Sequence, residues 1–469
     1  MAGEAMQQFT NRTYDEIEVG ASDTVVRTLT ATDVEALALA AGDVEAFHLD
    51  LTPGAVAEAA TAPGVAAVAL VAGVLNRRLP GPGSAIVGTQ FHYAGKVRAG
   101  DTLTVMVTAS AKHASGQRID FRCRCTNQEG DVLVDGVATV AAPANRIAYT
   151  NIATPEVLLR RNDALARLLQ RCEGLPPVTC AVVHPCDYES LMGAIESAKR
   201  CLIVPVLVGP EAKIRAAAEL VGIDITPWRI VDVPHSHAAA DRAVAMARAG
   251  EVEALMKGSL HTDELMEAVV PSATGLRTER RISHVFVMDV PAYPRTLMIT
   301  DAAINIAPDL SCKADICRNA IDLAHVLGNP SPKVAILSAA ETVNPKIEST
   351  LHAAALCKMA DRGQITGGIL DGPLAFDNAV SPEAARTKGI VSPVAGVADI
   401  LLVPDIESGN MIAKQLTYLA GADSAGIVVG TRVPIVLTSR ADNVRSRLAS
   451  TAVLKLVAHD RRSKLLPKD

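Results

Sequence analysis

Apolar and polar residues alternate along four stretches in the first third of the chain, with Gly/Asp turns between them. The stretches cover residues 85–91, 102–109, 118–125 and 132–140. A period of two is typical of strands with one buried face. Two helical patterns come first: one at 34–41 that Thr30 would cap, and a small-residue apolar run at 64–75 expected to be buried on all sides. A buried helix followed by four long strands predicts an antiparallel sheet wrapped around a helix.

Beyond residue 173 the pattern changes to short apolar runs that alternate with longer helical spacing. Strands are predicted at 178–183, 203–208, 333–337 and 400–403, and helices at 187–199, 211–221, 346–362 and 410–420. This alternation is typical of a largely parallel α/β sheet with both faces covered. About 300 residues exceed one usual core, so two lobes are expected, with a ligand cleft near the carboxyl ends of strands.

The joint between the halves lies at 141–146, where the strand pattern stops. A Leu- and Arg-rich segment at 154–172 predicts a helix that is either a connector or the first helix of the next unit. We therefore divide the chain into a first domain at 1–145, a connector region at 146–172 and a second domain at 173–469, whose second lobe would span about 312–428.

Near the end of the chain, a β-branched strand pattern at 433–438 stops abruptly at Ser439, Arg440 and Asp442, and helical spacing resumes at 447–457. The pattern predicts a buried strand that delivers a hydroxyl, a guanidinium and a carboxylate to a helix start, where unpaired N–H groups favour an anion. The planar fork of arginine suits phosphate better than a lysine does. The plain alternative is that Ser439 or Asp442 only caps the helix.

Four other polar turns follow or precede apolar segments in the second half. Each could be a simple turn, because Gly, Pro, Asn and Asp form turns for backbone reasons alone. Several polar turns closing apolar strands are also what a pre-formed binding cleft requires. The residues predicted to bind substrate in these turns are Lys257, Gly258, Thr262, Asn305, Asn378, Asn410 and Lys414.

Composition narrows the classes of function. Among 469 residues, 49% are hydrophobic and 20% charged, which indicates a globular protein. An aromatic content of 3% and a net charge of −6 disfavour nucleic acid as a partner. The start lacks a secretory signal and the apolar run at 65–75 is too short to span a bilayer, so we expect no membrane association and a cytoplasmic location.

Cysteines and glycine motifs exclude further classes. The nine cysteines form no CxxC pair, and Cys123 and Cys125 lack further ligands, so we expect reduced thiols and no metal site. No GxGxxG or GxxxxGK[ST] follows a predicted strand, which disfavours dinucleotide and P-loop sites. A two-lobed dehydrogenase therefore remains only as an alternative.

Asp43 and His48 lie five residues apart in a loop after the first predicted helix. Together they could position a water for proton transfer, which needs a base for the water and an acid to protonate the α-carbon. A plain surface loop is the alternative. With the motifs at 79–83 and 97–103, residues 11–144 resemble the MaoC-like (R)-specific enoyl-CoA hydratases, an α+β hotdog domain. The resemblance implies that Asp43 and His48 are the catalytic dyad.

Two departures from the hydratase pattern stand out. Glu45-Ala46 replaces the family's Asn-Pro, and Ala67-Val68-Ala69 replaces its His-Gly-Met. That glycine is associated with the amide that polarises the thioester carbonyl, and the Cβ of Val68 would crowd the thioester. We expect the hydratase activity to be altered or weak. A hotdog domain that only binds acyl-CoA or mediates assembly is the alternative.

The segments at 256–262, 300–308, 370–374, 403–414 and 439–440 occur in the order seen in the phosphate acetyl- and butyryltransferases, which residues 178–456 resemble. The resemblance implies an α/β two-lobed subunit related in fold to isocitrate and isopropylmalate dehydrogenases, with the first lobe completed by the C-terminal segment. The implied reaction is acyl-CoA plus phosphate giving acyl phosphate plus coenzyme A. Coenzyme A thioesters and phosphate would be substrates, with no covalently bound cofactor.

The same resemblance assigns roles at the end of the chain. Arg440 would hold phosphate and stabilise charge at the acyl carbon, while Ser439 would hydrogen-bond the thioester or thiol. The acetyltransferases carry a basic aspartate seven residues after the serine, where this chain has Ser446, so Asp442 is the substitute base. They also carry an arginine where this chain has Glu267, and the acyl group is left open between acetyl and longer chains.

Both resemblances point to acyl-CoA thioesters. The leading hypothesis is therefore a fusion of an enoyl-CoA hydratase-like hotdog domain with a phosphate acyltransferase. A single hotdog domain would leave a long sheet edge and half a ligand tunnel exposed, so we expect a homo-oligomer, at least a dimer.

Overall fold

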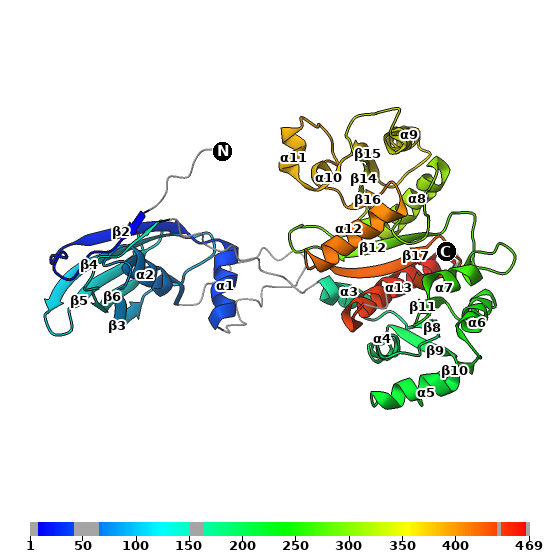
Figure 1. The fold of residues 1–469 in the computed structure, drawn as a ribbon, viewed down its shortest axis with the longest axis horizontal. Coiled ribbons are helices and arrows are strands. Elements are labelled where there is room, and N and C mark those ends of the chain that lie inside the picture. Colours follow the sequence, from blue (N-terminus) through cyan, green and yellow to red (C-terminus); the bar gives the residue numbers. More distant parts are fainter. Residues whose placement is uncertain (1–7, 42–64, 151–163, 439–441, 466–469) are drawn as a thin grey trace. The chain divides into compact units, whose positions relative to one another are not determined.

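The computed structural model describes residues 8–41, 65–150, 164–438 and 442–465. The chain divides into two compact units, Met1–Leu159 and Arg160–Asp469, which are coloured blue to cyan and cyan to red (Figure 1). No helix within the described ranges has the length and hydropathy needed to cross a bilayer.

The first unit is a five-stranded antiparallel sheet in the order β2-β4-β5-β6-β3, with a helix packed on it (Figure 1). A two-stranded pair, β1 with β7, accompanies it. The strands are β1 (Gln8–Thr10), β2 (Ser22–Thr28), β3 (Ala85–Tyr93), β4 (Thr102–His113), β5 (Arg118–Thr126), β6 (Val132–Ala141) and β7 (Ala148–Thr150); the helices are α1 (Ala31–Ala41) and α2 (Val65–Arg77).

The predicted antiparallel sheet around a helix is confirmed. Strands β3 to β6 cover the four alternating stretches, and their inward residues pack with α2 in one apolar core. The cap at Thr30 is also confirmed, because its Oγ1 accepts from the N–H of Asp33 at 3.1 Å while Asp33 accepts from the N–H of Thr30 at 2.9 Å. The prediction that α2 is buried on all sides is wrong, since Ala69 is exposed.

The second unit is built on one mixed sheet of 11 strands in the order β10-β9-β8-β11-β18-β17-β12-β13-β16-β14-β15. The strands are β8 (Val178–Val183), β9 (Ile203–Gly209), β10 (Arg229–Asp232), β11 (Ala254–Lys257), β12 (Ser283–Asp289), β13 (Leu297–Thr300), β14 (Lys333–Leu337), β15 (Ile369–Leu374), β16 (Ile400–Leu402), β17 (Asp423–Val429) and β18 (Ile435–Val436).

Helices cover both faces of this sheet, as the alternating pattern predicted. One face carries α4, α8, α9 and α13, and the other carries α6, α7 and α12. The helices are α3 (Ala164–Cys172), α4 (Tyr188–Lys199), α5 (Glu211–Leu220), α6 (Ser236–Arg248), α7 (Thr262–Val269), α8 (Leu310–Val326), α9 (Glu348–Asp361), α10 (Phe376–Val380), α11 (Pro382–Thr387), α12 (Ile406–Tyr418) and α13 (Val444–Leu465).

The sheet contains two parallel groups that run in opposite directions. Strands β10, β9, β8, β11 and β18 form one group, and β13, β16, β14 and β15 form the other. Between them, β17 and β12 pair antiparallel with each other and with their outer neighbours. The prediction of a largely parallel sheet holds within each group, but the sequence did not show that the sheet is continuous. The lobe boundaries at 312 and 428 therefore stay a prediction.

The C-terminal segment completes the first group of strands. β18 pairs with β11, and α13 then lies along β17 and packs on α4 (Figure 1). α3 belongs to this second unit, where the guanidinium of Arg171 donates to the carbonyl of Val326 at 2.8 Å. Its described part begins at Ala164, so most of the longer helix predicted from residue 154 lies outside the described residues.

Candidate active site

The residues assigned the main chemistry fall partly outside the described ranges. Ser439 and Arg440 lie in the gap between 438 and 442, and Asp43 and His48 lie in the gap between 41 and 65. The structure does describe Asp442 and all seven predicted binding residues. The candidate site is therefore built from the segments that flank Ser439 and Arg440.

Lys257 connects β11 to the end of β18. β11 and β18 are parallel neighbours, so their carboxyl ends meet at one edge of the sheet. Lys257 ends β11, is 3% exposed, and its Nζ donates to the carbonyl of Thr438 at 3.4 Å. Thr438 immediately precedes Ser439. A buried ammonium thus lies beside Thr438, the residue that precedes the segment predicted to bind phosphate.

Gly258 allows the chain after β11 to pass close to β8. A Cβ at this position would lie 2.4 Å from the carbonyl oxygen of Val183 and 2.6 Å from that of His184. Since such distances are sterically forbidden, only glycine fits here. The passage lets Ser259 bind His184: its N–H donates to the His184 carbonyl at 3.0 Å, and its Oγ lies 3.0 Å from Nδ1.

Thr262 opens α7 in the same loop. His261 is the N-cap, and its N–H donates to Oε1 of Glu264 at 3.1 Å. The Ser236 hydroxyl donates to the same carboxylate at 2.5 Å, which lowers the pKa of Glu264. Thr262 is half-buried in the first turn, where N–H groups lack helical partners. The polar residues predicted to form a turn here therefore form the start of α7, and Thr262 lies in its first turn.

The loop after β13 folds around one carboxylate. Asp301 is 2% exposed and accepts from the N–H groups of Ala303 at 2.9 Å, Ile304 at 3.1 Å and Asn305 at 3.1 Å. The side-chain amide of Asn305 donates to the same carboxylate at 2.5 Å and to the carbonyl of Ile282 at 2.8 Å. Burial raises the pKa of Asp301, while these hydrogen bonds oppose the shift. Asn305 therefore holds the loop in shape.

Helix α12 packs directly on this loop. The side-chain amide of Asn410 donates to the carbonyl of Ala302 at 3.3 Å, and a Cβ on Gly409 would lie 2.8 Å from the carbonyl oxygen of Asp301. The predicted helix start at Asn410 is wrong by one turn. Asp405 caps the helix by accepting from the N–H of Ser408 at 2.8 Å, so Asn410 lies in the helix body. Lys414, one turn later, is exposed.

Three of the predicted segments share one apolar cluster on the α7 side of the sheet. Leu260 from the loop after β11 and Leu437 from the end of β18 are buried in it, and Ala303 and Ile304 pack against it. The strands that carry these segments end at opposite edges of the sheet. The loop after β13 nevertheless lies against the same cluster as Leu260 and Leu437. Asn410 contacts this loop through its hydrogen bond to the carbonyl of Ala302.

Asn378 does not join this group by any described hydrogen bond. It lies in α10 and is fully buried, and both polar atoms of its side chain lack a hydrogen-bond partner within the described residues. The sequence around Asn378 contains polar residues and turn formers, and it gave no indication that Asn378 would be buried. Its predicted binding role stays a prediction, and its burial does not favour contact with a substrate.

Arg447 fastens the segment that follows Thr438. It is 2% exposed, and its Nη1 donates to Oγ1 of Thr438 at 2.9 Å while its Nε donates to the carbonyl of Asp442 at 3.3 Å. Both ends of the stretch that contains Ser439 and Arg440 are therefore held by one guanidinium. Burial lowers the pKa of Arg447, and the charges of Asp187 and Asp442 oppose that shift.

Comparison with known proteins identifies the family. The pattern described as phosphate acetyl/butaryl transferase matches residues 235–454. The phosphate acetyltransferase of Rhizobium meliloti is 65% identical over 297 residues, which are 63% of this chain and 94% of that protein. This chain belongs to the phosphate acetyl/butyryltransferase family.

Two solved structures complete the comparison. A branched-chain phosphotransacylase from Enterococcus faecalis V583 is 32% identical and covers 60% of this chain and 99% of its own, with a TM-score of 0.53. The unliganded R-hydratase PhaJ1 from Pseudomonas aeruginosa is 28% identical and covers 33% of this chain and all of its own, with a TM-score of 0.31. A TM-score this low supports no inference about the first unit.

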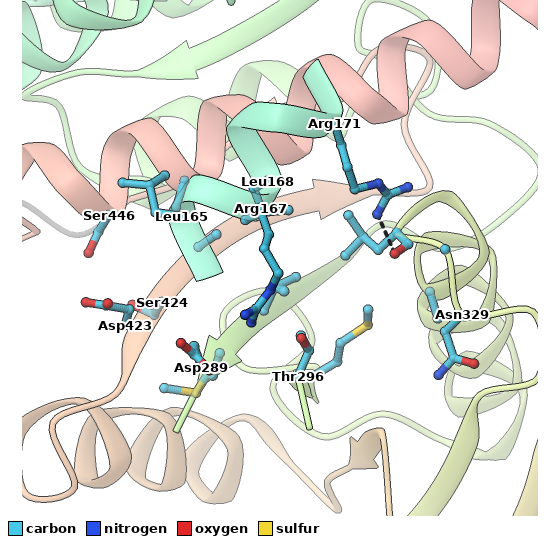
Figure 2. Close-up of a pocket in the computed structure, with 18 of the residues that line it drawn as sticks. Leu165, Arg167, Leu168, Arg171, Asp289, Thr296, Asn329, Asp423, Ser424 and Ser446 are labelled. Carbon is cyan, nitrogen blue, oxygen red and sulfur yellow. Dashed lines mark hydrogen bonds between the residues drawn. The ribbon is translucent and has the colours of Figure 1, made fainter. Parts of the chain in front are cut away.

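Ser446 occupies the position where the resemblance implied an aspartate. Ser446 lies in the first turn of α13, where its N–H donates to the side-chain oxygen of Asn443 at 2.9 Å. Its hydroxyl lines a cavity of about 380 Å³ between α3, α8 and α13, beside Asp423 and Ser424 (Figure 2). Apart from Met288, the apolar residues around this cavity lie on the α13 side of the sheet, whereas Leu260 and Leu437 lie on the other side.

Sequence reasoning missed two residues that shape the site of this family member. His184 comes after a short buried strand, and its partner Ser259 is 75 residues away in the chain. Arg447 lies in a helical pattern that gave no sign of its burial against Gly193, where an added Cβ would lie 2.6 Å from Cδ of the arginine. Both depend on contacts between distant segments, so neither leaves a local signal.

Proposed function

We propose that the second unit transfers an acyl group between coenzyme A and phosphate. The observation that carries the proposal is the 65% identity to a phosphate acetyltransferase over 94% of that protein. The acetyl group is the favoured substrate, because the phosphate acetyltransferase is 65% identical whereas a phosphate butyryltransferase is 44% identical. Acyl-CoA and inorganic phosphate are the substrates, and acyl phosphate and free coenzyme A are the products.

In the proposed reaction, a phosphate oxygen attacks the carbonyl carbon of the thioester, the C–S bond breaks, and the thiolate leaves with the electron pair. Arg440 holds the phosphate and offsets the charge that develops at the acyl carbon, and Ser439 hydrogen-bonds the thioester. The supporting geometry is a set of hydrogen bonds. Lys257 donates to the carbonyl of Thr438, and Arg447 donates to Oγ1 of Thr438 and to the carbonyl of Asp442. These contacts hold Thr438 and Asp442, the described residues on either side of the segment that carries Ser439 and Arg440.

Other attributes belong to the same proposal. They are a fold related to isocitrate and isopropylmalate dehydrogenases, a homo-oligomer of at least two copies, and a cytoplasmic location. Contacts to coenzyme A from Thr262, Asn410 and Lys414 complete it, and Asp442 is the proton acceptor that the sequence alone suggests. Support comes from Thr262, which opens α7 beside Leu260, and from Asn410, which donates to Ala302 in the loop that packs on the same cluster.

The direct test is thiol release. With the full chain, acetyl-CoA and phosphate, we expect phosphate-dependent release of free coenzyme A. Arg440→Ala should lower kcat/KM for phosphate about 10²-fold, because a charge-stabilising contact is worth about 3 kcal/mol. Arg215→Ala is the matched control, since its guanidinium forms an exposed pair with Glu211 of α5. Folded parent protein that releases no coenzyme A with either acetyl-CoA or butyryl-CoA would exclude the transferase.

For the first unit we propose hydration of trans-2-enoyl-CoA to (R)-3-hydroxyacyl-CoA, with Asp43 and His48 as the proton-transferring pair. The supporting observation is the antiparallel sheet packed on α2, the arrangement the hydratase resemblance implied. Val68, where the resemblance implied a glycine, lies in the first turn of α2 and is partly buried. The alternative is a module that binds acyl-CoA or mediates assembly without turnover.

Hydration of crotonyl-CoA by the full chain separates these alternatives. Changing both Asp43 and His48 to alanine should reduce the rate at least about 10²-fold, the loss expected when an acid–base pair is removed. His113→Ala, on an exposed histidine of β4 in the same unit, is the control. If the parent binds crotonyl-CoA but does not hydrate it, the non-catalytic alternative holds. Equal rates in the parent and the double variant would remove the assigned pair.

A further inference from the structure

His184 lies at the carboxyl end of β8, two strands from Thr438. β8 pairs with β11, and β11 pairs with β18, all in parallel, so the ends that carry His184, Lys257 and Thr438 are consecutive at one edge of the sheet. Neighbouring strands lie about 4.8 Å apart, which puts the His184 backbone about 10 Å from Thr438. A histidine at this distance is close enough to reach a substrate bound beside Thr438.

The hydrogen bonds of His184 define its tautomer. The Ser259 hydroxyl donates its only hydrogen to the His184 carbonyl at 2.8 Å. The same Oγ lies 3.0 Å from Nδ1, so it must accept there, and the proton of the ring sits on Nδ1. Nε2 then carries a lone pair, and no described residue hydrogen-bonds to it. The imidazole is therefore oriented as a base, held by its other nitrogen.

The backbone of His184 also holds the ring in place. Its φ is 56°, in the left-handed region that most side chains avoid. Its N–H donates to the Val208 carbonyl at 2.7 Å, and its carbonyl accepts from the N–H of Ser259 at 3.0 Å. These hydrogen bonds hold His184 in an unfavourable backbone conformation. Such strained conformations occur most often at functional sites.

Three charged groups act on the ring from the surrounding elements. Lys213 belongs to α5, Glu264 to α7, and Asp187 caps α4. Burial and the charge of Lys213 lower the pKa of His184, and the two carboxylates oppose them. Because the pKa falls below its usual 6.5, the ring is neutral at pH 7 and can accept a proton.

We propose that Nε2 of His184 accepts the thiol proton of coenzyme A when the enzyme forms acyl-CoA from acyl phosphate. The inference rests on the proposed transferase function. The S–H bond breaks and the proton moves to Nε2; the thiolate attacks the acyl carbon, and the C–O bond to phosphate breaks as phosphate leaves with the electron pair. In the reverse direction the imidazolium returns the proton to the departing thiolate. His184 then fills the role for which the sequence offered only Asp442.

The test compares His184→Asn with Asp442→Asn in the full chain, with acetyl phosphate and coenzyme A as substrates. Asparagine tolerates positive φ and its side-chain amide can still donate to Ser259, but it has no basic nitrogen. We expect kcat to fall about 10²-fold in His184→Asn. The parent should lose activity on the acid side as pH falls through a pKa below 6.5, because the protonated ring cannot accept a proton, and this limb should disappear in the variant. His325→Asn, on an exposed histidine of α8, is the control.

A second variant guards against a folding defect. His184→Gly suits φ of 56° and leaves a space that imidazole can enter, so added imidazole should raise its rate, but not that of His325→Gly. An active parent with unchanged rate and pH limb in His184→Asn would overturn the assignment, as would loss of the acid limb in Asp442→Asn alone. A parent that forms no acetyl-CoA would instead overturn the transferase function itself.

Discussion

Arg447→Ala is expected to lower the free energy of unfolding of the second unit by about 4 kcal/mol, in the range seen when large buried side chains are truncated or one partner of a buried polar contact is removed. The guanidinium is 2% exposed and donates to Thr438 and to the carbonyl of Asp442. Removing it empties the space beside Gly193 and takes a donor away from each of these acceptors. Acyl transfer should be lost together with stability, because the released segment carries Ser439 and Arg440.

Denaturant unfolding of the parent and variant at equal protein concentration measures the first effect. Arg445→Ala is the matched control, because Arg445 lies in the same helix, is partly exposed, and its Nε contacts Asp423 at 3.1 Å. We expect that control to cost at most about 1 kcal/mol. Equal losses in the two variants would contradict the fastening role of Arg447, as would an Arg447→Ala enzyme with parental kcat.

Asp301→Ala should cost about 3–4 kcal/mol. Three backbone N–H groups and the amide of Asn305 donate to this buried carboxylate, and each unsatisfied donor costs about 1–3 kcal/mol unless the loop opens to water. Opening the loop would also release α12, because Asn410 donates to Ala302 and Gly409 packs on the Asp301 carbonyl. We therefore expect the KM for coenzyme A to rise as well.

Urea unfolding and steady-state kinetics test the two parts of this prediction. Asp309→Ala, in the same connection to α8, is the control: its exposed carboxylate caps the helix by accepting from the N–H of Cys312 at 2.7 Å. Loss of a cap costs about 1 kcal/mol. The central role of Asp301 would be refuted if its variant were no less stable than the Asp309 variant.

The sequence predicted the regular parts of the fold well where a local pattern determines them. β8 matches its predicted bounds, and β14 does too, because each is a short apolar run between turn formers. β2 was missed, since Val25 and Val26 are adjacent and the alternation is broken. The antiparallel pair β12 and β17 was missed for another reason: a strand buried on both faces has no alternation that reveals its direction or partner.

Prediction of the site followed the same division. The sequence located the turns around Lys257, Asn305 and Asn410 because their residue types are specific to turns and caps. It could not separate Asn378, which is fully buried, from residues that line a surface. The roles of His184 and Arg447 depend on partners from distant segments, Ser259 and Gly193, and such pairings follow from the sheet order rather than from local periodicity.

The place of β18 in the sheet has a consequence for synthesis of the protein on the ribosome. β11 ends at Lys257, yet its neighbour β18 begins only at Ile435. At about 5–20 residues per second, the nascent chain would wait roughly 10–35 s before this strand emerges. Until then β11 presents an unpaired edge that other chains could join. Truncation before residue 435 should therefore yield aggregation-prone chains. The edge of β11 is covered only when the last segment of the chain has been synthesised.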